Sequence, residues 1–449
     1  MSEVEAASTT LRYAIVGAGA RAEMFARALA GGFPRTARLV AFCDTNRTRV
    51  KAHNDLLRDA GHLPVRAYAA TDFHRMLKEQ RVDVVVVCTT DRFHAEYICV
   101  ALEAGCDVVT EKPMTIDADG CRRILDAQAS SGRRVTVAFN YRYNPVHEKV
   151  REVLASGAIG DIGSVHFEWL LDTLHDADYF RRWHRDKANS GGLIVHKSTH
   201  HFDLINWWIG SSPELVFGIG QLLFYGAGNG ARRGLDLGYD RARGRTESFE
   251  DPFALRLDEV PRLRALYLDA EHEDGYRRDQ NVFAPGVSIE ADMAVLVRYR
   301  SGTTLTYHLT AYSPWEGYRV MFNGSRGRLE LEVTESSHTR SPAEADSDLP
   351  AQAAVLHGVG DSGPNSGARL LLRPLWQQPS QISLPPRHGD HGGGDVRMLE
   401  ELFGTPDPDP LGRHATHHDG ALSLLTGLAA NESFRTGLPV RVSDLLDRG

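Results

Sequence analysis

The strongest constraint on the fold is a regular alternation of short apolar runs and helix-length segments between residues 11 and 140. Residues 84–87 are four consecutive valines, which is typical of a parallel strand covered on both faces. Strands that alternate with helices predict a doubly wound α/β domain with a parallel sheet. The expected strands are Leu11–Val16, Leu39–Asp44, Val82–Thr89, Asp107–Glu111 and Val135–Asn140.

A glycine-rich turn follows the first of these runs and precedes a helical pattern, reading G-x-G-x-x-A from Gly17 to Ala22. Gly17 allows a tight turn, and Gly19 lets the backbone approach a pyrophosphate closely. Because strand and helix flank the motif, it predicts a dinucleotide-binding Rossmann domain over residues 11–143. The expected contacts of this loop with the cofactor are Gly17, Gly19, Ala20 and Arg21.

An acidic residue, Asp44, ends the second predicted strand. A carboxylate in this position hydrogen-bonds the adenosine ribose and repels a 2′-phosphate, so NAD is favoured over NADP. Arg47 and Arg49 keep NADP open as the less favoured cofactor, because either could turn toward a phosphate. Further cofactor contacts are expected at the carboxyl edge of the sheet from Thr89 and Thr90, and from His94 unless that residue only caps or packs its helix.

From residue 144 onward the strand candidates become longer and alternate in polarity, as in an antiparallel sheet with one buried face. We therefore expect residues 144–449 to form an α+β substrate and oligomerisation domain with a mostly antiparallel open sheet. Two stretches, near 225–285 and 334–386, read as insertions or loops. Residues 1–10 are polar and are expected to be disordered.

Bulk composition excludes several classes of protein. The net charge of −8 and the absence of a basic cluster argue against a nucleic-acid partner. The sequence contains no run of about 18 apolar residues, so no membrane span is expected. The N-terminus lacks signal-peptide features, and five cysteines without a C-x-x-C pair suit a reducing compartment, so a cytoplasmic location is expected.

Two further motifs carry groups suited to proton transfer. Glu111-Lys112-Pro113 follows a predicted strand, where a lysine beside a nicotinamide could polarise a substrate oxygen or carry its proton. By spacing alone Lys112 could equally be a surface lysine. The second motif runs from Gly191 to Asp203 and contains His200 three residues before Asp203.

Together the glycine loop, the E-K-P tripeptide and the H-x-x-D pair resemble the Gfo/Idh/MocA oxidoreductase family, which includes glucose–fructose oxidoreductase and inositol dehydrogenase. The resemblance covers most of residues 11–330 and again 418–440. It implies that Lys112 and His200 are catalytic and that Glu111 lies at the cofactor. It also implies an NAD-dependent dehydrogenase that oxidises a secondary hydroxyl of a sugar, sugar derivative or cyclitol, in a homodimer or homotetramer.

The chain departs from the family pattern at two positions. His196 stands where many members have aspartate, and Ser198 stands where they have glycine. Either His196 or His200 could then accept the proton; we favour His200 and expect His196 to contact the substrate. The sequence also suggests a zinc site made of His196, His200, His201 and Asp203. No metal is expected, however, because His196 precedes the predicted helix and the family needs none.

Other substrate contacts are expected where the two domains meet. Arg142 either contacts substrate or forms a salt bridge, and Asn140 in the same segment lines the cofactor. Tyr179 and Trp183 offer aromatic faces to a sugar ring, and Asp203 either binds substrate or orients His200. Two alternatives stay open: a redox-neutral enzyme that uses tightly held NAD for transient sugar oxidation with elimination or glycoside cleavage, and a non-catalytic dinucleotide-binding sensor.

Overall fold

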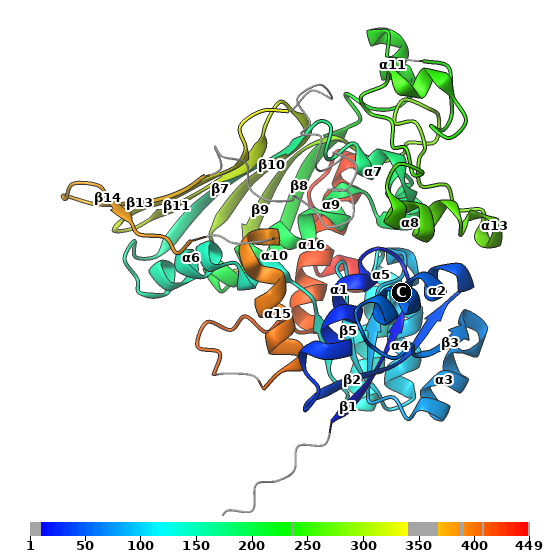
Figure 1. The fold of residues 1–449 in the computed structure, drawn as a ribbon. Coiled ribbons are helices and arrows are strands. Elements are labelled where there is room, and N and C mark those ends of the chain that lie inside the picture. The colour runs from blue at the N-terminus through cyan, green and yellow to red at the C-terminus, as the bar shows by residue number, and fades with distance from the viewer. Residues whose placement is uncertain (1–9, 236, 340–366, 387–389, 406–407, 448–449) are drawn as a thin grey trace, which may run out of the picture.

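The computed structural model describes residues 10–235, 237–339, 367–386, 390–405 and 408–447. Two domains lie one above the other, with the first sheet in the lower half of Figure 1 and a broad second sheet above it. The expected disorder of residues 1–10 falls, apart from Thr10, outside the described residues.

The lower domain contains a six-stranded sheet in the order β3-β2-β1-β4-β5-β6. All its strand pairs are parallel, which confirms the doubly wound sheet. The sequence did not predict β3, because two of its four residues are exposed and it lacks an apolar run. The strands are β1 (Leu11–Val16), β2 (Ala37–Asp44), β3 (Arg66–Ala69), β4 (Val84–Val87), β5 (Asp107–Thr110) and β6 (Val135–Val137).

Helices cover both faces of this sheet, because alternate residues of each strand point to opposite sides. Ala14 packs in the same core as Met76 of α3, whereas Ile15 packs with Phe25 of α1 and Leu57 of α2. The helices are α1 (Ala22–Arg27), continued by one π turn (Ala28–Gly32), α2 (Arg47–Asp59), α3 (Phe73–Gln80), α4 (His94–Glu103) and α5 (Ala118–Ser131). Both faces are therefore closed, and the carboxyl edge of the strands is left for ligands.

The upper domain contains a nine-stranded sheet in the order β14-β13-β12-β11-β7-β10-β9-β8-β15. Every pair is antiparallel except β7 with β10, which confirms a mostly antiparallel sheet. The strands are β7 (Ile162–Asp172), β8 (Pro213–Gln221), β9 (Asp292–Tyr299), β10 (Thr304–Ser313), β11 (Glu316–Gly324), β12 (Gly327–Ser336), β13 (Gly367–Pro374), β14 (Ser380–Ile382) and β15 (Val440–Arg441).

Helices cover one face of the upper sheet and leave the other open. Trp208 of α10 packs edge-on against Phe322 of β11, and Ser433 of α16 hydrogen-bonds Gly218 of β8. On the open face Ile219 and Leu296 remain 65% and 52% exposed. The main helices here are α6 (Pro145–Ala155), α10 (Ser198–Ile209) and α16 (His417–Thr436); α7 (Asp178–Arg181), α8 (Lys187–Ser190), α9 (Leu193–His196) and α17 (Asp444–Asp447) are single turns.

The two expected insertions differ from plain loops. Part of the 334–386 stretch forms β13 and β14 at the sheet edge, although residues 340–366 lie outside the described part of the chain. Its Pro, Gly and Ser content concealed these strands. The 225–285 stretch contains short helices: α11 (Ala227–Arg233), α12 (Pro261–Leu263) with a π turn (Arg264–Leu268), and α13 (Glu271–Asp274).

A late segment of the chain returns to the lower domain, contrary to the expectation that 144–449 forms one unit. In α15 (Gly394–Phe403) the ring of Phe403 packs edge-on against Tyr13, Phe25 and Phe33. Figure 1 shows this helix (orange) running down beside the first sheet. The first domain therefore has a core that includes residues from far along the chain.

Candidate active site

One cavity of about 810 Å³ follows the carboxyl edge of the lower sheet and continues beneath the upper domain. Most of the residues singled out from the sequence line it, whereas Arg142 and Asp203 do not. The predicted residues that line the cavity are Gly17, Gly19, Ala20, Arg21, Asp44, Thr89, Thr90, His94, Glu111, Lys112, Asn140, Tyr179, Trp183, His196 and His200.

The glycine loop has the geometry that a dinucleotide requires. Gly17 has φ of +91°, and a Cβ there would lie 2.5 Å from the carbonyl carbon of Cys88, so only glycine lets β1 and β4 approach this closely. Around Gly19 the nearest atom to such a Cβ is the hydroxyl of Tyr267, 4.0 Å away. The backbone at Gly19 is therefore open toward the cavity.

Asp44 lies at the end of β2 with both carboxylate oxygens engaged. It accepts hydrogen bonds from the backbone N–H of Ala18 at 2.5 Å and of Asn46 at 2.7 Å. Burial raises the pKa of this carboxyl, and the two backbone N–H groups oppose the rise. These bonds fix the side chain beside the glycine loop, in the place expected for a ribose contact.

A polar network holds the next part of the cavity wall. Arg21 donates to Glu111 at 2.6 Å and also contacts Asp395 of α15 at 3.3 Å. Asn140 donates to the same Asp395 at 2.6 Å. Asp395 was not among the predicted site residues, and the structure shows that it joins Arg21 to Asn140.

His94 is occupied by backbone groups rather than directed at a cofactor. Its Nδ1 lies 2.8 Å from the carbonyl oxygen of Pro113, and its Nε2 lies 3.1 Å from that of Thr89. Burial lowers the pKa of His94, so the neutral ring donates to one of these two oxygens and lies between the E-K-P turn and the end of β4. This contact agrees with the packing role that the sequence left open beside a cofactor contact.

Lys112 lies just after β5, where a cis peptide bond joins it to Pro113. Its Nζ donates to the carbonyl oxygen of His196 at 3.1 Å and lies 3.3 Å from Nε2 of that ring. Burial lowers the pKa of Lys112 to about 8, while Asp91 and Glu111 act in the opposite direction. The amine is therefore close to its titration range at neutral pH.

His196, in α9, lies between Lys112 and Asp91. Its Nδ1 is 2.6 Å from a carboxylate oxygen of Asp91. Burial lowers the pKa of His196 well below its usual value, and the charge of Lys112 adds to this effect. A neutral ring that donates from Nδ1–H to Asp91 and accepts at Nε2 from Lys112 satisfies all three groups. The position of Asp91 just after β4 was the one sequence signal for its role.

His200 lies on α10 and is held by aromatic rings. It stacks on Tyr141, with ring centroids 4.3 Å apart and planes 15° apart, and meets the edge of Phe139. Both His200 and Lys112 line the same cavity. The predicted catalytic pair therefore meets in one site, although the two residues come from different domains.

A second lysine, Lys197, lies in the cavity and was not predicted. Its Nζ donates to the hydroxyl of Tyr141 at 3.3 Å and lies 5.4 Å from the ring of Trp169. Burial lowers the pKa of this amine, but neighbouring acidic groups, led by Tyr141 and Tyr179, raise it above its usual value overall. Lys197 thus keeps its positive charge at the substrate end of the cavity.

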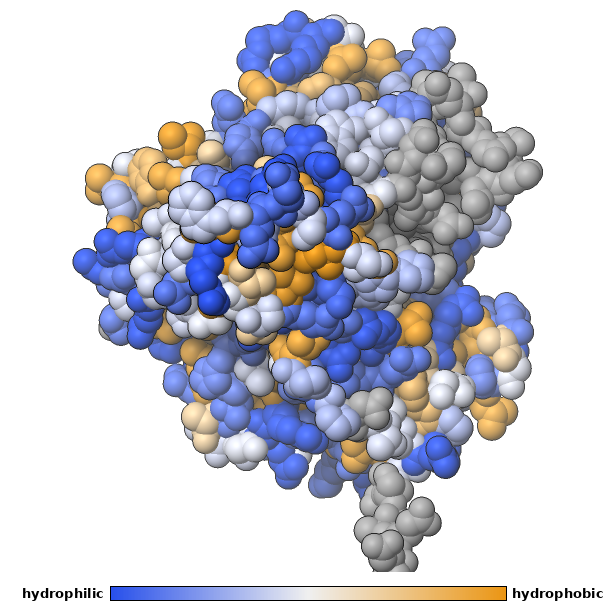
Figure 2. Space-filling view, turned by 90° about the vertical axis from the view of Figure 1, so that its left-hand side faces the viewer, coloured by the Kyte–Doolittle hydropathy of each residue, from blue (hydrophilic) through white to orange (hydrophobic). Residues whose placement is uncertain are grey.

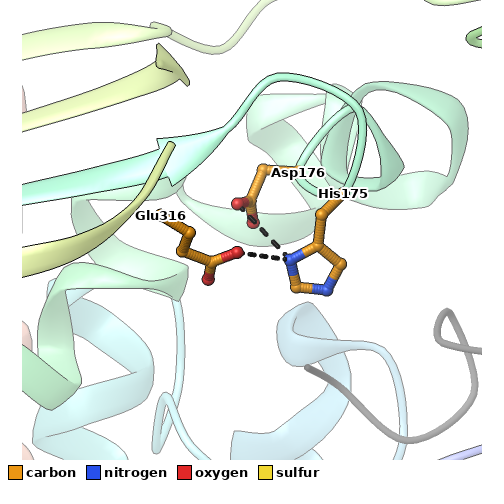
Figure 3. A group of neighbouring side chains, drawn as sticks. All are labelled: His175, Asp176 and Glu316. Atoms are coloured by element: carbon orange, nitrogen blue, oxygen red, sulfur yellow. Dashed lines mark hydrogen bonds and ion pairs between the residues drawn. The ribbon is translucent and has the colours of Figure 1, made fainter. Parts of the chain in front are cut away.

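Within the described residues, one group of His, Asp and Glu side chains could hold a metal ion. It consists of His175, Asp176 and Glu316 and lies near Lys197 (Figure 3). Nδ1 of His175 lies 3.0 Å from Glu316 and 3.7 Å from Asp176. Despite burial, these carboxylates raise the pKa of His175 to about 10. A protonated His175 offsets part of their charge, so the group is an ion-pair cluster unless a cation displaces that proton.

Arg142 and Asp203 form a buried ion pair instead of the predicted substrate contacts. The guanidinium donates to both carboxylate oxygens of Asp203, at 2.8 and 2.6 Å, and to Asp419 at 2.9 Å. The Arg142 and Asp203 side chains are 3% and 1% exposed. Their polar atoms are satisfied by the protein, and the pair joins the end of the lower sheet to α10 and α16.

Tyr179 and Trp183 form an aromatic wall beside His196. Tyr179 meets His196 at a tilt, with centroids 5.6 Å apart, and Trp183 stacks on His184 at 3.5 Å. Both tyrosine and tryptophan line the cavity, as expected from the sequence.

Two family models match the chain. One, described as an oxidoreductase family with an NAD-binding Rossmann fold, matches residues 11–139. The other, described as the C-terminal alpha/beta domain of the same oxidoreductase family, matches residues 151–442. The chain belongs to the Gfo/Idh/MocA oxidoreductase family. As a member of that family it is an oxidoreductase, and the resemblance seen in its motifs is confirmed.

Curated relatives give further context. The chain is 32% identical over 436 residues to YteT of Bacillus subtilis (strain 168), which is named as an oxidoreductase. This match covers 94% of the chain and 95% of that protein. It is 29% identical to inositol 2-dehydrogenase of Rubrobacter xylanophilus, but this match covers 47% of the chain and 55% of that enzyme. The chain thus spans about half the length of the inositol dehydrogenase that it matches.

Solved structures share the whole fold at low identity. Aldose-aldose oxidoreductase from Caulobacter crescentus, complexed with glycerol, superposes with a TM-score of 0.61 at 17% identity, covering 96% of this chain and 100% of that one. An oxidoreductase from Agrobacterium radiobacter in complex with NAD+, L-tartaric acid and magnesium gives 0.62 at 14% identity, covering 98% and 100%. These comparisons show a common two-domain fold.

A helix that spans a lipid bilayer must be both long and apolar. Within the described residues, no helix combines sufficient length with sufficient hydrophobicity to span a membrane.

Proposed function

We propose that this oxidoreductase is an NAD-dependent dehydrogenase that oxidises a secondary hydroxyl of a sugar, sugar derivative or cyclitol. The observation that carries the proposal is one cavity shared by the glycine loop, Asp44, Lys112 and His200. A cavity that combines a cofactor loop with two side chains able to transfer protons is what such a reaction requires, and this supports the proposal.

When bound, NAD supplies the hydride acceptor. Lys112 donates a hydrogen bond from Nζ to the substrate oxygen and stabilises the negative charge that develops there. His200 accepts the hydroxyl proton, held in orientation by its stacking on Tyr141. His196 positions Lys112 through Nε2 and contacts the substrate from the cavity wall.

A polyhydroxylated substrate suits the far end of the cavity. Tyr179 and Trp183 present aromatic faces for the C–H side of a ring, and Lys197 offers N–H donors for its hydroxyl groups. Relatives named inositol 2-dehydrogenase and a structural neighbour named aldose-aldose oxidoreductase support the same substrate class. NAD is favoured over NADP because Asp44 brings a carboxylate to the ribose end.

We further propose a homodimer or homotetramer that buries the open face of the upper sheet. That face carries exposed Ile219 and Leu296 beside Phe217 and Met321 in a shallow groove. Hydrophobic residues also gather among hydrophilic ones in the upper half of the space-filling view (Figure 2). Exposed apolar area of this kind marks an interface. Light scattering of the wild type and of Leu296→Asp tests the proposed oligomer. A monomeric wild type would contradict it.

The function is tested by incubating the enzyme and NAD with a panel of sugars, cyclitols and glycosides, while following NADH absorbance and product mass together. NADH formed with one carbonyl product per turnover supports the dehydrogenase. Lys112→Ala and His200→Ala should each remove turnover, whereas the exposed α3 controls Lys78→Ala and His74→Ala should keep it. Unchanged turnover in both site variants would contradict the assigned site.

One observation favours a second candidate, the redox-neutral enzyme with tightly held NAD. Residues 255–268 pack over α2 at the nucleotide end of the cavity, and Tyr267 lies against the glycine loop. Such a cover would slow cofactor exchange, as a recycling enzyme requires. NAD that copurifies with the protein, and product that forms without net NADH, would favour this candidate; NADH released stoichiometrically into solution would rule it out.

A further inference from the structure

The segment from Leu255 to Tyr276 belongs to the upper domain in sequence but lies on the nucleotide side of the lower domain. Figure 1 shows α13 beside α2, and the π turn before α13 contacts that helix directly. Arg262 donates to Glu23 of α1 at 2.7 Å, and Asn46 donates to the carbonyl oxygen of Ala270 at 2.8 Å. The apolar part of the contact consists of Ala52, Leu255, Leu257, Val260, Leu263, Leu266 and Tyr267.

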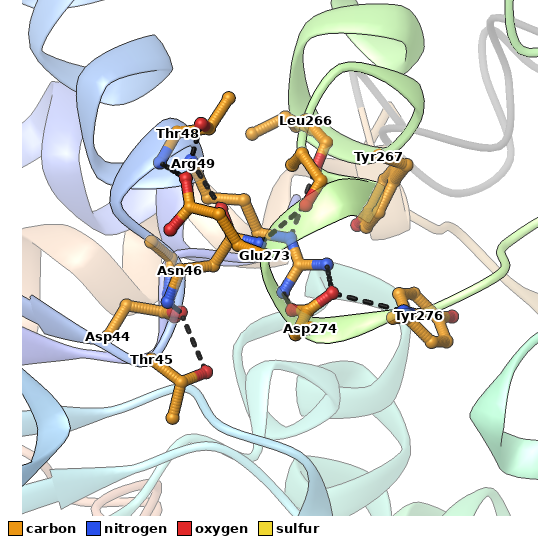
Figure 4. Close-up of polar contacts among 12 residues, drawn as sticks. Asp44, Thr45, Asn46, Thr48, Arg49, Leu266, Tyr267, Glu273, Asp274 and Tyr276 are labelled. Carbon is orange, nitrogen blue, oxygen red and sulfur yellow. Dashed lines mark hydrogen bonds and ion pairs between the residues drawn. The ribbon is translucent and has the colours of Figure 1, made fainter.

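Glu273, within this segment, binds the beginning of α2 (Figure 4). Its carboxylate accepts hydrogen bonds from the backbone N–H groups of Arg47 at 2.7 Å and Thr48 at 2.8 Å, and from the Thr48 hydroxyl. These are the first N–H groups of a thirteen-residue helix, which have no partner within the helix. The bonds from Thr48 and Arg47 lower the pKa of Glu273, so it remains a carboxylate.

Asp274, the next residue, binds the guanidinium of Arg49. The closest approach is 2.7 Å, and Arg49 also donates from Nε to the carbonyl oxygen of Leu266 at 3.0 Å. The Arg49 side chain is 11% exposed and the Asp274 side chain 20%. Arg49 lines the cavity together with Asp44 and Thr45, at the end where the adenosine ribose is expected.

The groups that Glu273 and Asp274 occupy are those that a 2′-phosphate would need. An anion beside the ribose at the end of β2 would find its hydrogen bonds at the first N–H groups of α2 and its countercharge at Arg49. In this structure a carboxylate of the chain itself holds each of them. The Arg47 side chain is exposed, and Arg47 takes part in the contact with Glu273 through its backbone N–H.

We propose that Glu273 and Asp274 make the enzyme selective for NAD, by filling the α2 amides and neutralising the Arg49 that the 2′-phosphate of NADP would otherwise bind. The proposal rests on the dinucleotide-binding function proposed above. It adds two specificity-determining residues that lie outside the Rossmann sequence motif, about 230 residues along the chain from Asp44.

The charges around the site set the direction of the expected effect. The carboxyl groups of Asp44, Glu273 and Asp274 lie around the beginning of α2, and Arg49 is the buried cation among them. Replacing both added carboxylates by amides removes two negative charges and weakens the hold on the α2 amides and on Arg49, because a neutral amide oxygen is a weaker acceptor that a phosphate can displace. NADP affinity should therefore rise, whereas NAD, which has no phosphate there, should change little.

The test measures binding of NAD, NADP and 2′,5′-ADP to the full-length protein by calorimetry, independently of turnover. The variants are Glu273→Gln, Asp274→Asn and the double variant, with Glu250→Gln, an exposed residue of the same insertion, as the matched control. We expect the NADP-to-NAD ratio of Kd values to fall by about tenfold or more in the double variant. The NADP gain should shrink in high salt, because it is electrostatic.

The outcomes separate the two proposals. If wild type and double variant bind NAD equally and keep the same NADP-to-NAD ratio, the selectivity inference is wrong while the proposed function stands. A wild type that prefers NADP overturns the inference in the same way. If the wild type binds neither NAD nor NADP, the proposed function and this inference are both wrong. If the double variant fails to fold by circular dichroism, Glu273→Gln alone decides the question.

Discussion

Nε2 of His196 lies 3.3 Å from Nζ of Lys112. Many family members have aspartate at this position, which would place a carboxylate directly on the lysine. In this enzyme the carboxylate is supplied by Asp91, which contacts the far side of the imidazole at 2.6 Å. A neutral ring thus separates the acid from the amine, and the charge of Lys112 is balanced at longer range.

Removing the amine should abolish most of the chemistry. Lys112→Ala is expected to lower kcat about 10²–10⁴-fold, the usual contribution of a positioned proton-transfer group. The substrate KM should change much less, because Tyr179, Trp183 and Lys197 remain. Steady-state kinetics against Lys78→Ala checks this, and an equal loss in that surface variant would show that the effect is not specific.

Activity should fall as the pH rises through about 8. The pKa of Lys112 is lowered to about 8 by burial, so its ammonium form, which binds the substrate oxygen, is lost above that pH. The kcat/KM profile should show this alkaline limb in the wild type. In Lys112→Arg the guanidinium stays charged, so any residual activity should lack the limb; an identical limb in that variant would assign it to another group.

Replacing Asp91 by asparagine should move the same limb to lower pH. The charge of Asp91 raises the pKa of Lys112, and the amide removes that support. We also expect kcat to drop about tenfold or more, because His196 loses the acceptor that fixes its ring. A profile that keeps its position while kcat falls would indicate a merely structural role for Asp91.

The Arg142–Asp203 pair should matter for stability rather than for substrate binding. Arg142→Met leaves Asp203 and Asp419 without their buried partner, and is expected to cost about 3–5 kcal/mol of unfolding free energy. Exposed Arg58→Met should stay within about 0.5 kcal/mol. Denaturant unfolding measures both. A normal Tm in Arg142→Met together with a raised substrate KM would restore the original expectation of a substrate contact.

The sequence predicted the parts of the site whose signal is local. The glycine loop and the E-K-P tripeptide place Gly17 and Lys112 at strand ends, and strand ends of a parallel sheet share one edge. The same reasoning found both sheets, because polarity alternates along strands regardless of their partners. It missed β3, which lacks an apolar run, and β13, whose three leucines lie within a Pro-, Gly- and Ser-rich stretch.

Contacts between distant segments were beyond such reasoning. The sequence offered a salt bridge for Arg142 but not Asp203 as its partner, and it gave no indication that Asp91 reaches His196 from another domain. Nor does composition show that Glu273, in a Gly- and Arg-rich insertion, binds the amides of α2. These pairings depend on how the two domains pack, which only the folded chain displays.

The return of α15 to the lower domain has a consequence for synthesis. As the polypeptide leaves the ribosome, strands β1 to β6 appear first, but the ring of Phe403 that completes their core and the Asp395 that joins Arg21 to Asn140 emerge some 250 residues later. The nucleotide cavity therefore reaches its final form only after most of the upper domain has been translated. We therefore expect a nascent chain that lacks α15 to hold its cofactor less firmly than the mature enzyme does.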